Sequence, residues 1–415
     1  MRILILVDCY YPSSKSSAKL IHDLGVELHQ QGNEVIVVTP SESKTRDLDV
    51  SREEGLLIAR IKTGKIKGAP KVYRALQEAR LSTTLWRKGK QFFQEHPSDL
   101  IIFYSPSIFW APLVRRLKSL WNCPAYLILR DIFPQWAVDL GVLRKGLIYK
   151  FLRMKELEQY DCADIIGVQS PANLEYFTKK LPNKNYHVEV LYNWTKLNEP
   201  NKVLSDYRNL FGLQEKVVFF YGGNIGVAQD MDNMLRLAFS LRHESHIFFL
   251  LVGEGSEVTH LKIAIKTKGL ENTRILPAVA QQEYLAMLSE FDVGLVSLDR
   301  RLQTHNFPGK ILGYMYSSMP ILASLNPDND LGTMLDKNEA GLCSLNGDDR
   351  TLHTHALTLA NNSTLRKRMG QNARHLLEQT FSVSSAAKQI LAHAQETPTS
   401  YVGTAKAKHA GASSL

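Results

Sequence analysis

Three groups of residues have the types and spacing needed to bind an anion, and the first is the glycine-rich segment VVFFYGGNIGVAQDMDN over 217–233. Five apolar or aromatic residues precede Gly222 and Gly223, and a helix is expected to begin near Asp230. A strand followed by a glycine turn and a helix commonly directs backbone N–H groups at a phosphate. A tight turn between a strand and a helix also needs glycine for steric reasons, so this segment alone fits a phosphate site and a purely structural turn equally.

Lys310, within the segment FPGKILGYM, is the second feature and a candidate source of positive charge. Asn306 is a candidate helix cap and Pro308 suits a first turn, so Lys310 is expected at the start of a helix. A lysine is unfavourable there because the helix dipole is already positive at that end. Its presence is better explained if an anion binds at the same place.

Polar residues also follow two expected strands in the N-terminal half. Lys15 lies among serines, including Ser16, at the start of an expected helix. Hydroxyls, backbone amides and one ammonium can hold an anionic or sugar ligand, although ordinary capping serines explain the same residues. Arg130 and Asp131 leave the strand expected over 125–129 beside aromatic residues, which suits a sugar-facing site or a structural ion pair.

Other motifs are weak. The segment LVGEGSEV over 251–258 is half a dinucleotide fingerprint, with Val258 at the place of the third glycine, and we interpret it as a strand-to-helix turn with Glu254 exposed. No such fingerprint follows the first strand, which argues against a dinucleotide oxidoreductase. His243 and His246 have no second cluster of ligands near them in the sequence, so we interpret them as surface residues and not as a metal site.

The elements that must position these residues alternate between strand-like runs and helical periodicity, as in parallel sheets covered by helices on both faces. Strands are expected over 2–8, 34–38, 56–61, 99–105, 125–129, 164–170 and 187–192, and again over 217–223, 246–253, 274–276, 292–298 and 320–324. A polar, irregular segment near 195–215 separates the two sets. The sequence therefore predicts an α/β chain with two Rossmann-like domains joined near residue 200 and a cleft between them.

Length and composition agree with a globular chain of two domains. There are 415 residues, 44% of them hydrophobic and 22% charged, and the apolar runs are far shorter than the ~20 residues that span a bilayer. The first apolar run is too short for a signal peptide, so we expect a cytoplasmic protein. Four scattered cysteines without a CxxC pair favour reduced thiols.

The positive charge of the chain is concentrated in one segment. Residues 60–90 hold ten basic residues and one acidic residue, a net charge of +9 that equals the net charge of the whole chain. Apolar residues alternate with these charges, which suits an anionic membrane surface as well as it suits a solvated loop and helix. No recognisable nucleic-acid-binding motif accompanies the segment, so we expect no nucleic-acid partner.

Taken together, these segments resemble the family 4 glycosyltransferases, which are retaining enzymes of the GT-B fold. Within that family the chain looks most like the bacterial enzymes that extend polyprenyl-diphosphate-linked sugars for O-antigen, capsule and exopolysaccharide, including the fucosamine transferases. The motifs that carry the resemblance occur in the family's order: LVDCYYP, RDIFPQWAVDLG, LYNWTK, YGGNIGVAQDMDNML, FFLLVGEG, RILPAVAQQEYLAMLSEFDVGLVSL and FPGKILGYMYSSMPILAS.

The resemblance implies that the C-terminal half binds a nucleotide sugar and the N-terminal half binds the acceptor. It implies catalytic roles for Asp131, Lys310 and Arg130, without a metal or other cofactor. The candidate substrate-binding residues are then Lys15, Ser16, Gly222, Gly223, Asn224, Glu254, Val279, Pro308, Gly309 and Tyr314.

The chain departs from the family's pattern at several of these places. Asn224 and Gln229 stand where members often carry an arginine and a lysine, and Gly313 stands where a glutamate usually contacts the ribose of the donor. Arg130 replaces a common histidine, and the double glycine of the first loop is replaced around Lys15.

The expected domains are an acceptor domain over 1–198, a nucleotide-sugar domain over 199–380, a helix over 381–395 that can pack back on the first domain, and a disordered tail over 396–415. The expected activity is transfer of a sugar, with retention, from a UDP-sugar to a lipid-linked saccharide at the inner face of the membrane. The donor sugar can be an N-acetylated deoxyhexosamine. The alternatives are a non-catalytic homologue that binds a nucleotide sugar or a partner transferase, and a GT-B epimerase or phosphorylase.

Overall fold

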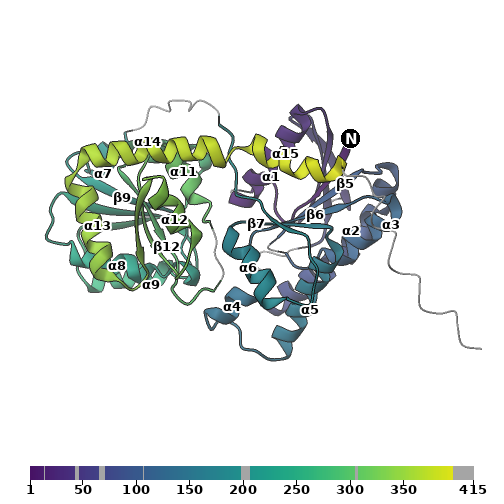
Figure 1. Ribbon diagram of the computed structural model, residues 1–415, viewed down its shortest axis with the longest axis horizontal. Helices are drawn as coiled ribbons and strands as arrows, with labels where there is room; N and C mark the ends of the chain where they lie inside the picture. The colour runs from purple at the N-terminus through teal and green to yellow at the C-terminus, as the bar shows by residue number, and fades with distance from the viewer. Residues whose placement is uncertain are drawn as a thin grey trace, which may run out of the picture.

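The computed structural model describes residues 1–13, 15–42, 46–64, 71–105, 107–197, 206–303 and 307–395, without the side chains of 16, 71–77, 394 and 395. Within these residues the chain forms two α/β lobes that lie side by side (Figure 1). The predicted tail over 396–415 and the candidate cap Asn306 lie outside the described residues.

The N-terminal lobe, over its described residues, contains an eight-stranded sheet in the order β3-β4-β2-β1-β5-β6-β7-β8. Its strands are β1 Arg2–Leu6, β2 Glu34–Ser41, β3 Leu48–Glu53, β4 Leu56–Lys62, β5 Leu100–Tyr104, β6 Ala125–Leu129, β7 Ile165–Val168 and β8 Val188–Val190. Its helices are α1 Ser16–Gln30, α2 Lys71–Glu95, α3 Ala111–Trp121, α4 Gln135–Asp139, α5 Leu147–Cys162 and α6 Pro171–Lys180. Neighbouring strands are parallel apart from β3, which pairs antiparallel with β4.

Alternate residues of the central strand β1 point to opposite faces of this sheet, as the period of a strand requires. Ile3 and Ile5 pack in the core formed with α1, whereas Leu4 and Leu6 pack in the core formed with α2 and α3. All four side chains are fully or almost fully buried. Helices therefore cover both faces, and the carboxyl ends of the strands are left to face the cleft.

The C-terminal lobe contains a six-stranded parallel sheet in the order β11-β10-β9-β12-β13-β14 within the described residues. Its strands are β9 Val217–Asn224, β10 Ile247–Glu254, β11 Thr273–Leu276, β12 Val293–Ser297, β13 Ile321–Leu325 and β14 Gly341–Leu345. Its helices are α7 Tyr207–Phe211, the 3-10 turn η1 Val227–Gln229, α8 Met231–Ser240, α9 Val258–Thr267, α10 Gln281–Glu290, α11 Lys310–Tyr316, α12 Asp330–Lys337, α13 Asp349–Asn361 and α14 Ser363–Thr380.

The last described helix, α15 Val383–Gln395, returns to the N-terminal lobe and lies beside α1 (Figure 1). Gln389 donates a hydrogen bond to the Val190 carbonyl at 2.8 Å, and His393 Nε2 lies 2.9 Å from Glu189. At the crossing, Thr195 N donates to Phe381 O at 2.9 Å and Val383 N donates to Thr195 O at 3.2 Å. The two chain segments that run between the lobes are thus hydrogen-bonded to each other.

All twelve predicted strands are present, with ends shifted by a few residues, and two strands were not predicted. β3, with the sequence LDVSRE, lies at the edge of the sheet and is largely polar, so it has no apolar run to reveal it. β14 is five residues long and also lies at an edge. The predicted α/β fold with two parallel-sheet lobes is confirmed.

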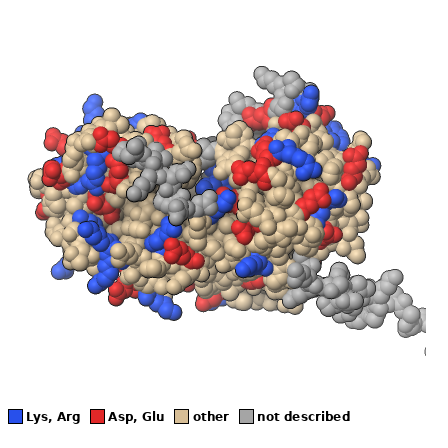
Figure 2. Space-filling model, turned by 90° about the horizontal axis from the view of Figure 1, so that it is seen from above, with Lys and Arg blue, Asp and Glu red and all other residues tan. Residues whose placement is uncertain are grey.

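The interpretation of residues 60–90 as a membrane-facing segment is wrong for three of its apolar residues, which are buried. Ile61, Leu81 and Leu85 are buried in the core of the N-terminal lobe, where no membrane can contact them. Lys88 pairs with Asp47 at 2.7 Å. On the face shown in Figure 2, Lys and Arg are interspersed with Asp and Glu over both lobes. No described helix has the length and apolar composition needed to cross a membrane.

The attachment of α15 gives a first prediction. Ile390 of α15 is fully buried, so Ile390→Ala leaves a cavity and should lower the free energy of unfolding by about 2–4 kcal/mol in urea titrations. Lys388→Ala on the exposed side of the same helix should change it by less than about 0.5 kcal/mol. Equal midpoints for the two variants would show that α15 is not held against the lobe in solution.

Candidate functional site

The glycine turn lies where the ends of β9 and β10 touch. Gly223 pairs with Gly253, and a Cβ atom added at Gly253 would lie 1.9 Å from the Gly223 carbonyl oxygen. Gly223 itself has φ +118°, in the region that favours glycine. The two glycines therefore allow an approach of two backbones that no larger residue permits, and they shape the turn from both sides.

The structure brings Lys310 to this turn from α11, some 85 residues further along the chain. Its Cε atom would lie 3.7 Å from a Cβ atom at Gly223, and its Nζ atom lies 3.4 Å from the centre of the Tyr221 ring. Burial lowers the pKa of the Lys310 ammonium well below its ordinary value. No carboxylate among the described residues pairs with it. A bound anion would supply the missing counter-charge and raise that pKa again.

Asn224 and Gln229, the two neutral departures from the family's pattern, are hydrogen-bonded to each other. Asn224 Nδ2 donates to Gln229 Oε1 at 2.9 Å, and the same oxygen accepts from Gly226 N at 3.1 Å. Tyr221 O–H donates to the Asn224 carbonyl at 2.6 Å, which fixes the end of β9. A neutral amide pair thus closes the turn, and the positive charge beside it comes from Lys310.

The segment that carries Lys310 is held by the other lobe. Gln169, after β7, accepts from Phe307 N at 3.0 Å, and Asn193 donates to Phe307 O at 2.9 Å. The Phe307 side chain is buried against Tyr192, with ring centres 5.6 Å apart. Both backbone groups of Phe307 are therefore bound by N-terminal side chains, three residues before Lys310.

Arg130 contributes to the same support. Its Nη1 donates to Leu191 O at 2.5 Å and its Nη2 to Tyr192 O at 3.3 Å, and its guanidinium lies over the Trp194 ring at 5.0 Å. Burial lowers the pKa of Arg130 to about 10. Its Nε has no hydrogen-bond partner among the described residues, and Arg130 also lines the cleft, so its catalytic role stays a prediction.

Asp131 lies on the N-terminal wall of the cleft. Burial raises the pKa of its carboxyl to about 6, with Arg130 acting in the opposite direction and Asp8 adding to the rise. A carboxyl with a pKa near neutrality changes its charge within the physiological range, which suits it to interact with a hydroxyl that loses a proton.

The cleft between the lobes, of about 1020 Å³, collects most of the predicted residues. Those that line it are Lys15, Arg130, Asp131, Gly222, Gly223, Asn224, Glu254, Val279, Pro308, Gly309 and Lys310. The backbone of Ser16 begins α1, and its side chain lies outside the described part of the chain.

Tyr314 was predicted to contact substrate, and the structure contradicts this. Its side chain is fully buried, its hydroxyl accepts from Gly222 N at 3.1 Å and it donates to Leu295 O at 3.2 Å. Both hydrogen-bonding capacities are used beneath the glycine turn. Tyr314 therefore supports the turn from inside the lobe.

Tyr284 occupies the space that the glycine at 313 leaves open. A Cβ atom would lie 2.3 Å from Tyr284 Cε2 at Gly222 and 3.2 Å from Tyr284 Cε1 at Gly313. The ring, which also lines the cleft, therefore fits between these two positions because both lack a side chain. Neither the spacing of apolar residues around Tyr284 nor its neighbours in the sequence distinguish it from an ordinary residue of an amphipathic helix.

His22 and Asp23 of α1 also line the cleft and were not predicted. His22 Nδ1 lies 2.8 Å from Tyr10 Oη and its Nε2 lies 3.2 Å from Glu54 Oε1, while Asp23 pairs with Lys19. The available signal was the placement of two polar residues between Ile21 and Leu24 on the apolar side of an expected helix.

The comparisons with known proteins agree with this geometry. Residues 207–376, which contain the glycine turn and Lys310, match the family described as glycosyl transferases group 1. The match lies within the C-terminal lobe.

Two curated relatives are similar over part of the chain. Probable glycosyltransferase WbjE of Pseudomonas aeruginosa is 26% identical over 219 residues, which are 52% of this chain and 54% of that protein. Putative colanic acid biosynthesis glycosyl transferase WcaI of Escherichia coli (strain K12) is 25% identical over 225 residues, 51% of this chain and 54% of that protein. The chain thus spans about half the length of the curated relatives it matches.

Solved structures share the fold over nearly the whole chain. Sucrose-phosphate synthase from Thermosynechococcus elongatus aligns with a TM-score of 0.74 and 16% identity over 94% of this chain and 98% of that one. Anabaena HepE in complex with UDP and glucose aligns with a TM-score of 0.68 and 15% identity over 95% and 99%. These likenesses show the predicted GT-B fold.

The structure describes no group of three or more His, Cys, Asp or Glu side chains placed to hold a metal ion. Metal-independent chemistry stays a prediction.

The buried ammonium gives a second prediction, on stability. Lys310→Met removes a charge that the folded state holds less readily than the unfolded state, so it should raise the free energy of unfolding at pH 7 by on the order of 1 kcal/mol. The unfolded chain binds the proton up to pH ~10.5, so wild-type stability rises with pH through the window between the lowered pKa and that value. Urea titrations at pH 7 and 9.5 measure both effects.

Lys262→Met, at an exposed position of α9, is the matched control for this prediction. It removes one lysine without relieving burial, so it should leave the stability and its pH dependence unchanged. A Lys310→Met protein that is no more stable than this control would contradict the assignment of an uncompensated charge.

Proposed function

We propose that the chain transfers a glycosyl group, with retention, from a UDP-sugar to a hydroxyl of a polyprenyl-diphosphate-linked saccharide. The observation that carries this proposal is the Lys310 ammonium, unpaired with any described carboxylate, beside a glycine turn in the cleft. A nucleoside diphosphate supplies the anion that such a site lacks. The UDP-bound state of the HepE neighbour supports the choice of a uridine donor.

In the proposed reaction, the bond between the anomeric carbon and the diphosphate oxygen breaks, and a bond to the acceptor oxygen forms on the same face of the sugar. Negative charge grows on the leaving diphosphate. Lys310, which lines the cleft beside the turn, is positioned to stabilise that charge, and electrostatic stabilisation of this kind is usually the largest single contribution to rate. The proton of the acceptor hydroxyl passes to the departing phosphate oxygen.

Asp131, across the cleft, is proposed to hold the acceptor hydroxyl. As a carboxylate it accepts a strong hydrogen bond and orients the attacking oxygen, whereas in its protonated form it carries no negative charge and accepts more weakly. Because burial raises its pKa to about 6, the site changes from inactive to active as pH rises through that value.

The acceptor and the location are inferred from the chemistry of the relatives. WcaI is described as a colanic acid biosynthesis transferase, and a solved neighbour, WaaG, as a transferase of lipopolysaccharide biosynthesis. We place this chain in the synthesis of a bacterial surface polysaccharide such as O-antigen or capsule, in the cytoplasm and peripheral to the inner face of the membrane. An N-acetylated deoxyhexosamine is the candidate donor sugar.

One observation favours a second candidate, a homologue that binds a nucleotide sugar or a partner transferase without turnover. The Asn224–Gln229 pair replaces two cations of the family's pattern, and Tyr284 occupies the space beside Gly313. Fewer cations give weaker stabilisation of a leaving diphosphate. Product formation from purified protein, lipid-linked acceptors and a panel of nucleotide sugars separates the two candidates.

Donor binding gives the third prediction. Calorimetric titration of the protein with UDP should show proton uptake at pH values between the lowered pKa of Lys310 and its ordinary value of about 10.5, because the diphosphate raises that lowered pKa. Affinity should therefore fall as pH rises. Lys310→Met should bind UDP at least about tenfold more weakly, without proton uptake, and should lose most turnover, whereas Lys262→Met should match the wild type. Absence of UDP and GDP binding to the wild type would overturn both candidates.

The carboxyl on the acceptor side gives the fourth prediction. Turnover should fall on the acid side of about pH 6, and Asp131→Asn should lower turnover and remove that acid limb because an amide does not titrate. UDP affinity should not change in this variant. Asp49→Asn, at an exposed position of β3, is the control and should retain the wild-type profile. A wild-type profile for Asp131→Asn would exclude its role.

A further inference from the structure

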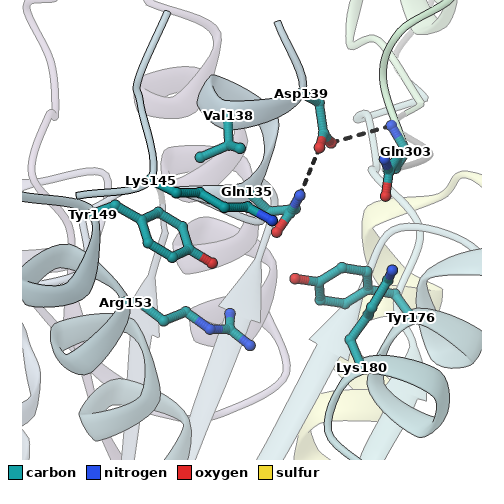
Figure 3. Close-up of a pocket in the computed structure, with 9 residues that line it drawn as sticks. All are labelled: Gln135, Val138, Asp139, Lys145, Tyr149, Arg153, Tyr176, Lys180 and Gln303. Atoms are coloured by element: carbon teal, nitrogen blue, oxygen red, sulfur yellow. Dashed lines mark hydrogen bonds between the residues drawn. The ribbon is translucent and has the colours of Figure 1, made fainter. Parts of the chain in front are cut away.

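A second cavity, of about 540 Å³, lies beside the cleft at the end of the N-terminal lobe that carries α4, α5 and α6 (Figure 3). It opens between these three helices and is also lined by Gln303 of the C-terminal lobe. The side chains that give it its chemistry are Lys145, Tyr149, Arg153, Tyr176 and Lys180. None of them was singled out in the sequence.

Positive charge dominates the lining. Lys145 and Lys180 extend into the space from different sides in Figure 3, and Arg153 reaches into it from α5. Arg153 is already engaged, since its Nη1 lies 2.5 Å from Glu156 Oε2. Among the described residues neither Lys145 nor Lys180 is paired with a carboxylate. These two ammonium groups therefore leave the cavity with charge that an anion can neutralise.

Neutral donors complete the set. The hydroxyls of Tyr149 and Tyr176 both point into the cavity (Figure 3). The carboxylate of Asp139, at the rim, accepts hydrogen bonds from Gln135 Nε2 at 2.6 Å and Gln303 N at 3.2 Å. Ammonium and hydroxyl donors directed at one space match the several acceptor oxygens of a phosphate or diphosphate.

The outer side of α5, together with the turn before it, is apolar and exposed. We call the residues Val142, Leu147, Ile148, Phe151 and Met154 the apolar tip. Leu147 is 86% exposed and Ile148 is 68% exposed, which is unusual for adjacent large apolar side chains. The spacing of 147, 151 and 154 places these three residues on one side of α5, and Val142 lies before the helix begins at Leu147.

We propose that this cavity binds the diphosphate of the lipid-linked acceptor and that the apolar tip contacts its prenyl chain. The inference rests on the proposed function and locates the acceptor of that reaction. An amphiphile with an anionic head and an apolar tail matches what α5 presents, since the apolar Ile148 is followed directly by the cavity-lining Tyr149. A free phosphate would use the cations and leave the tip unexplained.

The position of the cavity also fits the reaction. Gln135, at its edge, begins α4 only four residues after Asp131, so α4 connects the cavity to the proposed acceptor side of the cleft. Asp139 and Gln303 join the two lobes at the same rim. A saccharide attached to a diphosphate in the cavity extends along α4 towards Asp131.

The test uses the full chain and two probes, geranyl diphosphate and inorganic diphosphate, in calorimetric titrations with UDP present in saturating amount to occupy the donor site. The wild type should bind geranyl diphosphate more tightly than inorganic diphosphate. The double variant K145Q/K180Q should weaken geranyl diphosphate binding by at least about tenfold. Leu147→Ser with Ile148→Ser should weaken geranyl diphosphate and leave inorganic diphosphate unchanged.

The matched control is K150Q/K179Q, which removes one lysine from α5 and one from α6 at positions that do not line the cavity. It changes net charge by the same amount, so it should retain wild-type binding. Equal weakening in the two double variants would reduce the effect to general electrostatics and overturn the site. Equal affinity for both probes, unaffected by the changes at the tip, would overturn the lipid part.

Separate measurements distinguish failure of this inference from failure of the proposed function. UDP binding to K145Q/K180Q should equal that of the wild type, because the donor site is elsewhere. If wild-type protein turns over a lipid-linked acceptor and K145Q/K180Q does so with the same KM for it, the inference is wrong and the function stands. If no UDP binds, the function fails whatever the second cavity binds.

Discussion

The desolvated ammonium of Lys310 is the constraint on which the rest of the site depends. A buried charge without a carboxylate destabilises a folded chain, and the surrounding structure must hold it in place. Tyr221 offers only the face of its ring, and the N–H groups of Gly222 and Gly226 in the adjacent turn are bonded to Tyr314 and Gln229. Such an arrangement is favourable when an anion completes it, which is why a residue that is poor for stability is good for binding.

Support for that charge comes from the lobe that does not contain it. Arg130 binds the carbonyls of Leu191 and Tyr192, and the next residue, Asn193, binds Phe307. Gln169 accepts a hydrogen bond from the N–H of the same residue. Arg130, which follows a strand, therefore supports the Lys310 segment indirectly, through the backbone that it holds in place. The site is a property of both lobes together and cannot be assembled from the C-terminal sheet alone.

Much of the fold followed from the sequence because buried parallel strands are continuous apolar runs, and β1 and β9 are of this kind. β3 escaped because an edge strand does not need such a run. In the site, Lys310 and the glycine turn were recognisable because each breaks a local rule, one of charge and one of backbone conformation. Tyr284 and Tyr149 break no local rule, since a tyrosine in an amphipathic helix is ordinary. Tyr284 gains a role only from the space left by Gly222 and Gly313. Tyr149 gains one only where α5 meets α6. Arg130 was conspicuous at the end of a strand, but its contacts with Leu191, Tyr192 and Trp194 could not be read from the sequence.

The two chain crossings between the lobes, at Thr195 and Ser382, are hydrogen-bonded to one another, so both covalent connections lie along a single edge. Two connections along one edge can act as a hinge, so rotation about that edge is the expected relative motion of the lobes. The hydrogen bonds of Phe307 with Gln169 and Asn193 oppose this rotation, because rotation breaks them. Lys310 lies three residues after Phe307. A rotation that opened the cleft would therefore loosen the supports of Lys310 at the same time as it separated the two walls of the cleft.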